Sequence, residues 1–400
     1  MSVLKPNLLS EQQCQEIATR HMLSFITLGG AKAELPSYLR RPSGESLFSF
    51  DALPESAIGG VAWFNWVSHD IYDVDGLLLF RDQSLDIGDG YEWGVRVAAS
   101  DLLRVPTLCV NARRRINIKA LKERMLKELV KRPDLKPLIV KGEEEVRLVC
   151  YHYPNLGILF YSQDDPATRF VIDVWDLTII PVNPSEQQEN PESVNAVWSP
   201  YDIVVRSTVA LFRSMWRRNV NLLPALPGSF KELLDTIAKA SAPGDVFTTP
   251  PIELVAREND DNCASATAQM ILKHHGETSH TQAAIADAMS TVSGGATPEN
   301  QVKGINKLVG TKLQAKLDDQ PSPEKAQCEI LKNRPFKVGS STHARAVGGF
   351  RVVAGNQTCL HILNPSPTSQ GSFCYEPWDP ITHANFMYVR PLEFEPCSFR

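Results

Sequence analysis

Short hydrophobic runs separated by turn residues dominate the first half of the chain. Examples are residues 60–67, 93–99, 107–111 and 169–180, which are rich in Val, Ile, Leu and aromatic side chains. Runs of this length and composition predict β-strands. Several strands in series with few helices between them predict a mixed, mainly antiparallel α+β domain, which we place at residues 1–181.

A helical pattern at residues 9–28 precedes these strands. Ser10 is a candidate N-cap, Gln13 follows three residues later, and Gly29 and Gly30 would end the helix. We therefore expect one helix ahead of the first strand.

The middle of the chain has the pattern of a connector. Residues 181–193 are polar and hold three prolines, which predicts a loop or linker. Helical stretches follow at about residues 200–218 and 229–240, and residues 245–251 hold two threonines and two prolines. We assign residues 182–250 to a linker and helical connector, and residues 251–400 to a second domain.

The second domain opens with a predicted helix that carries a cysteine in its first turn. Three short polar residues capable of capping a helix precede Cys263, and Gly276 is placed to end the helix. Backbone N–H groups and the helix dipole favour a thiolate at this position. The small residues that follow, Ala264, Ser265, Ala266 and Ala268, allow another element to approach closely. Cys263 is therefore a candidate nucleophile.

A candidate base lies further along the chain, at the start of a predicted hairpin. His343 precedes a strand-like run at 344–353, and a second strand at 358–363 ends at Asn364. The hairpin would bring Asn364 beside His343. Cysteine, histidine and an orienting asparagine are the parts of a thiol-based acyl-transfer site. His361 lies inside the second strand without such a partner, and Asp379 is a rival to Asn364.

The order of these segments resembles that of papain-like cysteine peptidases, closest to compact bacterial members such as double-glycine leader peptidase-like domains and avirulence-type effector proteases. The matching segments are 262–276, 334–339, 343–350 and 362–365, and the resemblance covers about residues 250–395. It implies a papain-like fold in which Cys263 attacks a carbonyl, His343 transfers the proton and Asn364 orients the imidazole.

One departure from the family pattern concerns the oxyanion. Family members usually carry a glutamine about six residues before the cysteine, where this chain has Arg257. Asn259 is the nearest candidate side-chain donor, and the N–H of Cys263 is the candidate backbone donor. Loss of one oxyanion donor typically lowers the rate by on the order of a hundredfold.

Composition narrows the classes of function. The net charge is −5 and the isoelectric point is about 6.0, which argues against a nucleic-acid or anionic-membrane partner. No apolar run approaches the roughly 20 residues of a membrane helix, so we expect a cytoplasmic protein. Export by a route that does not use a signal peptide is an open alternative. Eight scattered cysteines without a Cys-x-x-Cys pair predict mostly buried thiols, with no metal and no cofactor.

The leading hypothesis is a cysteine protease that cleaves a protein or peptide substrate, with the N-terminal domain recognising the substrate or a protein partner. A glutamine deamidase or transglutaminase-like enzyme would use the same thioester chemistry. A binding module that retains the fold without catalysis is the third hypothesis, and the absent glutamine favours it.

Overall fold

The computed structural model describes most of the 400 residues. The described residues are 6–28, 35–60, 63–115, 117, 120–121, 123–125, 127, 131, 147–153, 155–161, 169–174, 177, 179–182, 208–240, 245–259, 261–292, 295–339, 343–380 and 382–392. Of the linker predicted at 181–193, residues 183–193 lie outside them, and Pro181 is the last residue of a strand.

Helices and strands contribute comparably to the described structure, which is an α+β fold as predicted. The helices are α1 (Glu11–Met22), α4 (Val209–Leu222), α5 (Phe230–Ala240), α6 (Cys263–His274), α7 (Gln282–Ala288), α8 (Pro298–Val309) and α9 (Pro323–Leu331). The strands of the N-terminal half are β1 (Ile58–Gly59), β2 (Trp63–Phe64), β3 (Val67–Tyr72), β4 (Leu78–Gly88), β5 (Tyr91–Ala98), β6 (Thr107–Arg114), β7 (Arg147–His152), β8 (Asn155–Tyr161), β9 (Arg169–Asp173) and β10 (Ile179–Pro181). Those of the C-terminal half are β11 (Val246–Phe247), β12 (Leu313–Asp318), β13 (Phe336–Gly339), β14 (Ala344–Val353), β15 (Gln357–Asn364), β16 (Ser372–Pro377) and β17 (Asn385–Pro391).

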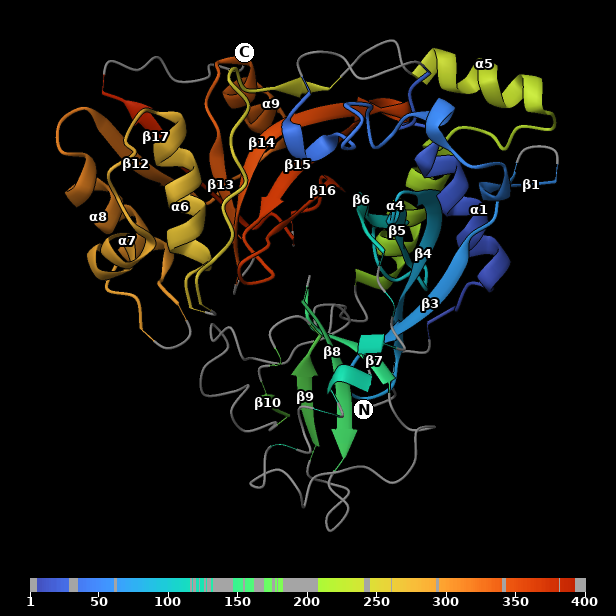
Figure 1. The fold of residues 1–400 in the computed structure, drawn as a ribbon, viewed down its shortest axis with the longest axis horizontal. Helices are drawn as coiled ribbons and strands as arrows, with labels where there is room; N and C mark the ends of the chain where they lie inside the picture. Colours follow the sequence, from blue (N-terminus) through green and yellow to red (C-terminus); the bar gives the residue numbers. More distant parts are fainter. Residues whose placement is uncertain are drawn as a thin grey trace.

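One sheet runs through both halves of the chain. Among the described residues its strand order is β10-β9-β8-β7-β3-β4-β5-β6-β16-β15-β14-β13-β17-β12, with β11 paired to β14. The pairing is antiparallel apart from the β3–β7 contact, which is parallel. The halves meet where Tyr375 of β16 pairs with Val110 of β6, near the middle of Figure 1. The N-terminal half therefore extends the sheet of the C-terminal half.

The first helix is shorter than the sequence pattern predicts. Ser10 and Gln13 form a reciprocal capping box, as expected, but α1 ends at Met22. The chain turns there because the N–H of Phe25 donates to the carbonyl of Met22 at 2.8 Å. This turn buries Phe25 and Ile26 against the strands of the N-terminal half. Gly29 and Gly30 lie outside the described residues.

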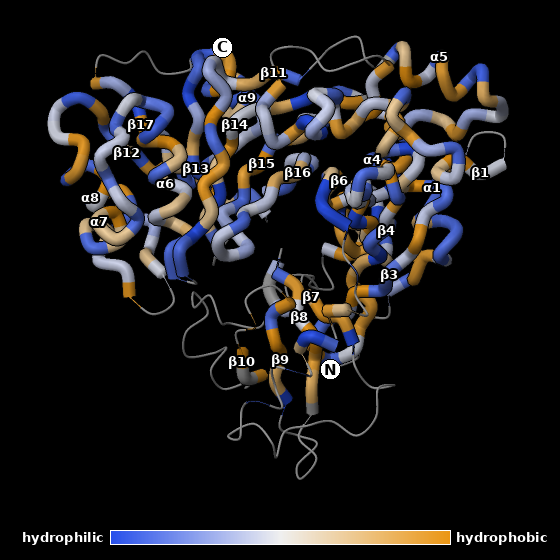
Figure 2. The backbone as a smooth tube through the Cα atoms, in the orientation of Figure 1, coloured by the Kyte–Doolittle hydropathy of each residue, from blue (hydrophilic) through white to orange (hydrophobic). Residues whose placement is uncertain are grey.

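The C-terminal half has a layered arrangement in which helices cover both faces of its strands. Helix α6 packs against β13 and β14, and Figure 1 shows α6, α7 and α8 together on the same side. The core on the α6 side holds residues of β14, β15 and β17, and a second core on the opposite face holds residues of α9. In Figure 2, hydrophobic stretches run along β14 as well as along β8 and β9 of the N-terminal half.

The predicted hairpin is confirmed. Strands β14 and β15 pair from Val353↔Gln357 at the turn to Ala346↔Leu363 at the open end. The turn passes through Gly355, whose φ of 74° is a conformation that glycine adopts without strain. The register places the end of β15 beside the start of β14.

Side chains also join the two halves. Tyr38 stacks on His361 with ring centroids 5.7 Å apart, and Arg351 Nη1 donates to the carbonyl of Ser24 at 2.9 Å. Helix α5 matches the helical stretch predicted at about 229–240, and α4 overlaps the one predicted at about 200–218 but runs on to Leu222. The domain boundaries at 181 and 250 remain predictions.

Within the described part of the chain, no helix combines the length and apolar character that a membrane crossing requires.

Candidate active site

Cys263 is the first residue of α6, as the sequence predicts. Asn262 is the N-cap residue, although its side chain forms no capping hydrogen bond. At the other end, the N–H of Gly276 donates to the carbonyl of Lys273 and the N–H of Glu277 to that of Leu272. Gly276 has a φ of 84°, which fits its predicted role at the helix end. Cys263 is 4% exposed and packs in the core between α6 and the sheet.

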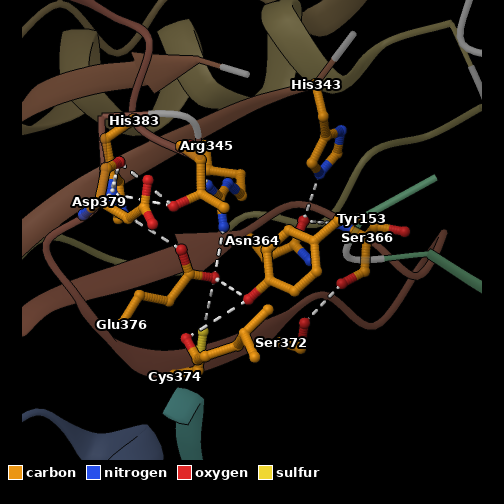
Figure 3. Close-up of polar contacts among 12 residues, drawn as sticks. Tyr153, His343, Arg345, Asn364, Ser366, Ser372, Cys374, Glu376, Asp379 and His383 are labelled. Atoms are coloured by element: carbon orange, nitrogen blue, oxygen red, sulfur yellow. Dashed lines mark hydrogen bonds and ion pairs between the residues drawn. The ribbon is translucent and has the colours of Figure 1, made fainter. Parts of the chain in front are cut away.

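His343 and Asn364 contact each other through their side chains. His343 Nε2 lies 2.7 Å from Asn364 Oδ1, and Figure 3 shows the ring pointing to the amide. Asn364 Oδ1 also accepts the backbone N–H of Ser366 at 3.0 Å. Because a backbone N–H only donates, this second bond identifies the shared atom as oxygen. Nε2 therefore carries the proton, which leaves Nδ1 of His343 as the nitrogen that can accept one.

Cys263 shares a hydrophobic core with the chain neighbours of this pair. Its core contains Ala344, which follows His343, and Leu363, which precedes Asn364. Helix α6 packs directly on the strand that begins at Ala344. Small side chains at Ala264 and Ala268 are buried in this contact and permit the close approach. Cys263 thus belongs to the same helix–sheet layer as the residues next to His343 and Asn364.

The two alternative residues take part in other contacts. Asp379 pairs with Arg104, and its backbone N–H donates to His383 Nδ1 at 3.1 Å. His361 is fully buried among aromatic rings, and burial lowers its pKa to about 3. A histidine held neutral in an apolar core is a packing element. Asn364 is the predicted orienting residue whose side chain contacts His343.

The candidate oxyanion donor lies in an exposed turn before α6. Asn259 Oδ1 accepts the backbone N–H of Asp261 at 3.1 Å, and the Asn259 carbonyl accepts the N–H of Asn262. Arg257 is buried, and its backbone pairs with Pro365 and Ser369 in the loop that follows Asn364. These bonds fasten the segment before the cysteine helix to the end of β15. The oxyanion role of Asn259 remains a prediction.

Sequence analysis did not single out Lys337, which lies in the same layer. It is 2% exposed, and its Nζ donates to Asn385 Oδ1 at 2.6 Å. The signal in the sequence is a lone lysine between Phe336 and Val338 in an otherwise apolar strand. Burial lowers the pKa of Lys337 to about 8, against the opposing attraction of Cys263 and Glu299.

A buried ionic network lies beside the site and includes a residue of the N-terminal half. Glu376 Oε1 accepts hydrogen bonds from Arg345 Nη1 at 2.5 Å and from Tyr153 Oη at 3.1 Å, and Oε2 lies 3.2 Å from His383 Nε2. Burial raises the pKa of Glu376, but the attraction of Arg345 and the contact with His383 outweigh it and lower the pKa to about 2. Figure 3 shows Glu376 at the centre of these contacts. Through them, Tyr153 connects to Arg345, two residues after His343.

The described residues contain no group of three or more His, Cys, Asp or Glu side chains arranged to hold a metal ion. Among the described residues, the cysteines outside any disulfide are Cys14, Cys109, Cys150, Cys263, Cys359 and Cys374, and all of them except Cys374 are buried. Cys328 is disulfide-bonded, so the expectation of thiols does not hold for that residue.

Comparison with known proteins gives similarity to solved structures. No protein-family model matches the chain, and no curated protein matches it. Among solved structures, the chain is similar to the peptidase domain of Streptococcus ComA, described as a bi-functional ABC transporter involved in a quorum-sensing pathway. The sequence identity is 17%, the match covers 35% of this chain and 98% of that chain, and the TM-score is 0.28.

Proposed function

We propose that the protein is a cysteine peptidase whose nucleophile is Cys263, with His343 as general base and Asn364 as orienting residue. The observation that carries this proposal is the 2.7 Å contact between His343 Nε2 and Asn364 Oδ1, together with the bond from Ser366 that fixes the amide. A histidine held in one tautomer next to a helix that begins with cysteine is the arrangement that activates a thiol.

The reaction follows from these roles. His343 Nδ1 accepts the thiol proton, and the Cys263 sulfur attacks the carbonyl carbon of a peptide bond. The tetrahedral anion collapses, the C–N bond breaks, and His343 returns the proton to the leaving amine. Water then attacks the thioester with His343 as base, which releases the acid product and restores the thiol. The backbone N–H of Cys263 and the side chain of Asn259 are the proposed oxyanion donors.

In this proposal the N-terminal half recognises the protein substrate or a partner. Two contacts support a role near the site: the pairing of β6 with β16 and the hydrogen bond from Tyr153 to Glu376. Strand β16 also pairs with β15, which ends at Asn364. A substrate segment bound along the N-terminal half would therefore lie beside the strands of the C-terminal half.

The test of the activity uses an unfolded protein such as casein as a general substrate, with Cys263→Ala as the matched control. New peptide termini in the wild-type reaction that are absent from the Cys263→Ala reaction would support the proposal. Mass increases of about one unit on intact substrate, without cleavage, would replace it with a glutamine deamidase. The control retains the fold because alanine fits the buried helix start.

A further inference from the structure

Lys337 lies on the face of the sheet that α6 covers. In the strand register it is opposite Ala346 on one side and Met387 on the other. Residues directly opposite each other in antiparallel strands point to the same face. Ala346 and Met387 belong to the core that contains Cys263. The Lys337 side chain therefore enters the layer between the sheet and the cysteine helix.

The ammonium group extends along this layer towards the start of β14. A methyl group placed on Gly339 would lie 2.5 Å from Lys337 Nζ and 2.7 Å from Asn385 Oδ1, so both atoms occupy the space beside that glycine. Gly339 in turn pairs with Ala344, the residue that follows His343. The lysine nitrogen is thus placed beside the end of the strand that carries the proposed base.

This cation lacks an acidic partner among the described side chains. Its hydrogen bond goes to the neutral amide of Asn385, and it forms no ion pair within the described part of the chain. Burying a charge without a counter-charge is costly. The ionisable groups that attract Lys337 are Cys263 at the start of α6 and Glu299 at the start of α8. Cys263 is buried in the same core as Ala346 and Met387, the strand neighbours of Lys337, whereas Glu299 is exposed. The anion that would best compensate the buried cation is the thiolate of Cys263.

We infer that Lys337 supplies the positive charge that holds Cys263 in its thiolate form. This inference rests on the proposed function, since it assigns an electrostatic role in the same site. The side chain acts through the field at the sulfur, so it is a positioning residue rather than one that touches the substrate. A nearby opposite charge typically shifts a titration by one to three pH units.

The test is the pH dependence of Cys263 alkylation in the full-length protein, read by peptide mass spectrometry. The variants are Lys337→Met, which removes the charge and suits a buried site, and His343→Ala. Lys316→Met is the matched control because Lys316 is exposed on β12 of the same sheet. The inference predicts that the midpoint of the Cys263 alkylation curve rises by about one pH unit or more in Lys337→Met. The midpoint in Lys316→Met stays within a few tenths of a unit of wild type.

The outcomes separate this inference from the proposed function. A low wild-type midpoint that rises in His343→Ala but not in Lys337→Met would overturn the role of Lys337 and leave the peptidase proposal intact. A wild-type midpoint of about 8.5, the value of an ordinary thiol, would overturn both. Should Lys337→Met fail to fold, Lys337→Gln keeps a polar group for Asn385 without the charge, and the same rise is expected. A purely structural lysine would alter melting temperature without moving the midpoint.

Discussion

His343 and Asn364 stand 21 positions apart in the sequence, yet Nε2 of the first lies 2.7 Å from Oδ1 of the second. The β14–β15 hairpin produces this contact by pairing Ala346 with Leu363. The bond from Ser366 fixes the amide so that its oxygen faces the ring. The relationship defines which nitrogen of His343 carries the proton and which one can accept a proton.

The first prediction concerns Asn364. Asn364→Ala removes the acceptor that holds the His343 tautomer, so kcat should fall by about tenfold or more. The upper bound of this loss is the whole contribution of general-base catalysis, which is roughly 10²–10⁴-fold. Asn364→Asp keeps an oxygen that can accept from both His343 and Ser366, so it should retain more activity than the alanine variant. Equal losses in the two variants would show that the acceptor is not what matters at this position. Steady-state kinetics on a peptide substrate provide the measurement.

The second prediction concerns Glu376 and the buried network. Glu376→Leu leaves Arg345 buried without its carboxylate, which typically destabilises a protein by about 3–5 kcal/mol. Tyr153→Phe removes one hydrogen bond to a charged acceptor and should lower stability by about 1.5–3 kcal/mol. Urea unfolding gives both values. Tyr72→Phe is the control, because Tyr72 donates to Asp70 in a half-buried site. A Tyr153 effect no larger than that of Tyr72 would contradict the buried network as a stabilising link.

The strand elements, the helix caps and the hairpin were predictable because their signals are local. The capping box of Ser10 and Gln13, Gly276 after α6, and the two apolar runs around residue 355 each act within a few positions. The join between β6 and β16 was not predictable, because residues 110 and 375 are far apart in sequence and nothing local selects that pairing. Lys337 was missed for a related reason. Its burial depends on α6, which comes about 70 positions earlier in the sequence.

The third prediction concerns acid stability. Burial lowers the pKa of His361 to about 3 and that of His21 to about 4. The unfolded chain, with histidine pKa values of about 6.5, binds more protons in this range, so stability falls as the pH falls below 6.5. Each histidine contributes a slope of about 1.4 kcal/mol per pH unit until its folded pKa is reached. His361→Leu should remove its share of the slope between pH 6 and 4, as measured by thermal unfolding across that range. An unchanged slope would contradict the burial of a neutral ring.

The fourth prediction concerns alkaline stability. Burial lowers the pKa of Lys337 to about 8, below the ordinary lysine value. Between about pH 8 and 10.5 the unfolded chain binds more protons than the folded one, so stability rises with pH in that window. Lys337→Met should lose this rise and be more stable than wild type at pH 7, by as much as about 3 kcal/mol. A less stable variant would indicate that the lysine contributes to packing more than its charge costs.

The measurement that tests the central claim most directly is the rate of Cys263 alkylation at about pH 6 in wild type and in His343→Ala. The account predicts rapid labelling of the wild-type thiol and a loss of about tenfold or more in the variant, because His343 accepts the thiol proton. Labelling that follows an ordinary thiol titration near 8.5 in both proteins would contradict a cysteine–histidine pair, and with it the proposed peptidase.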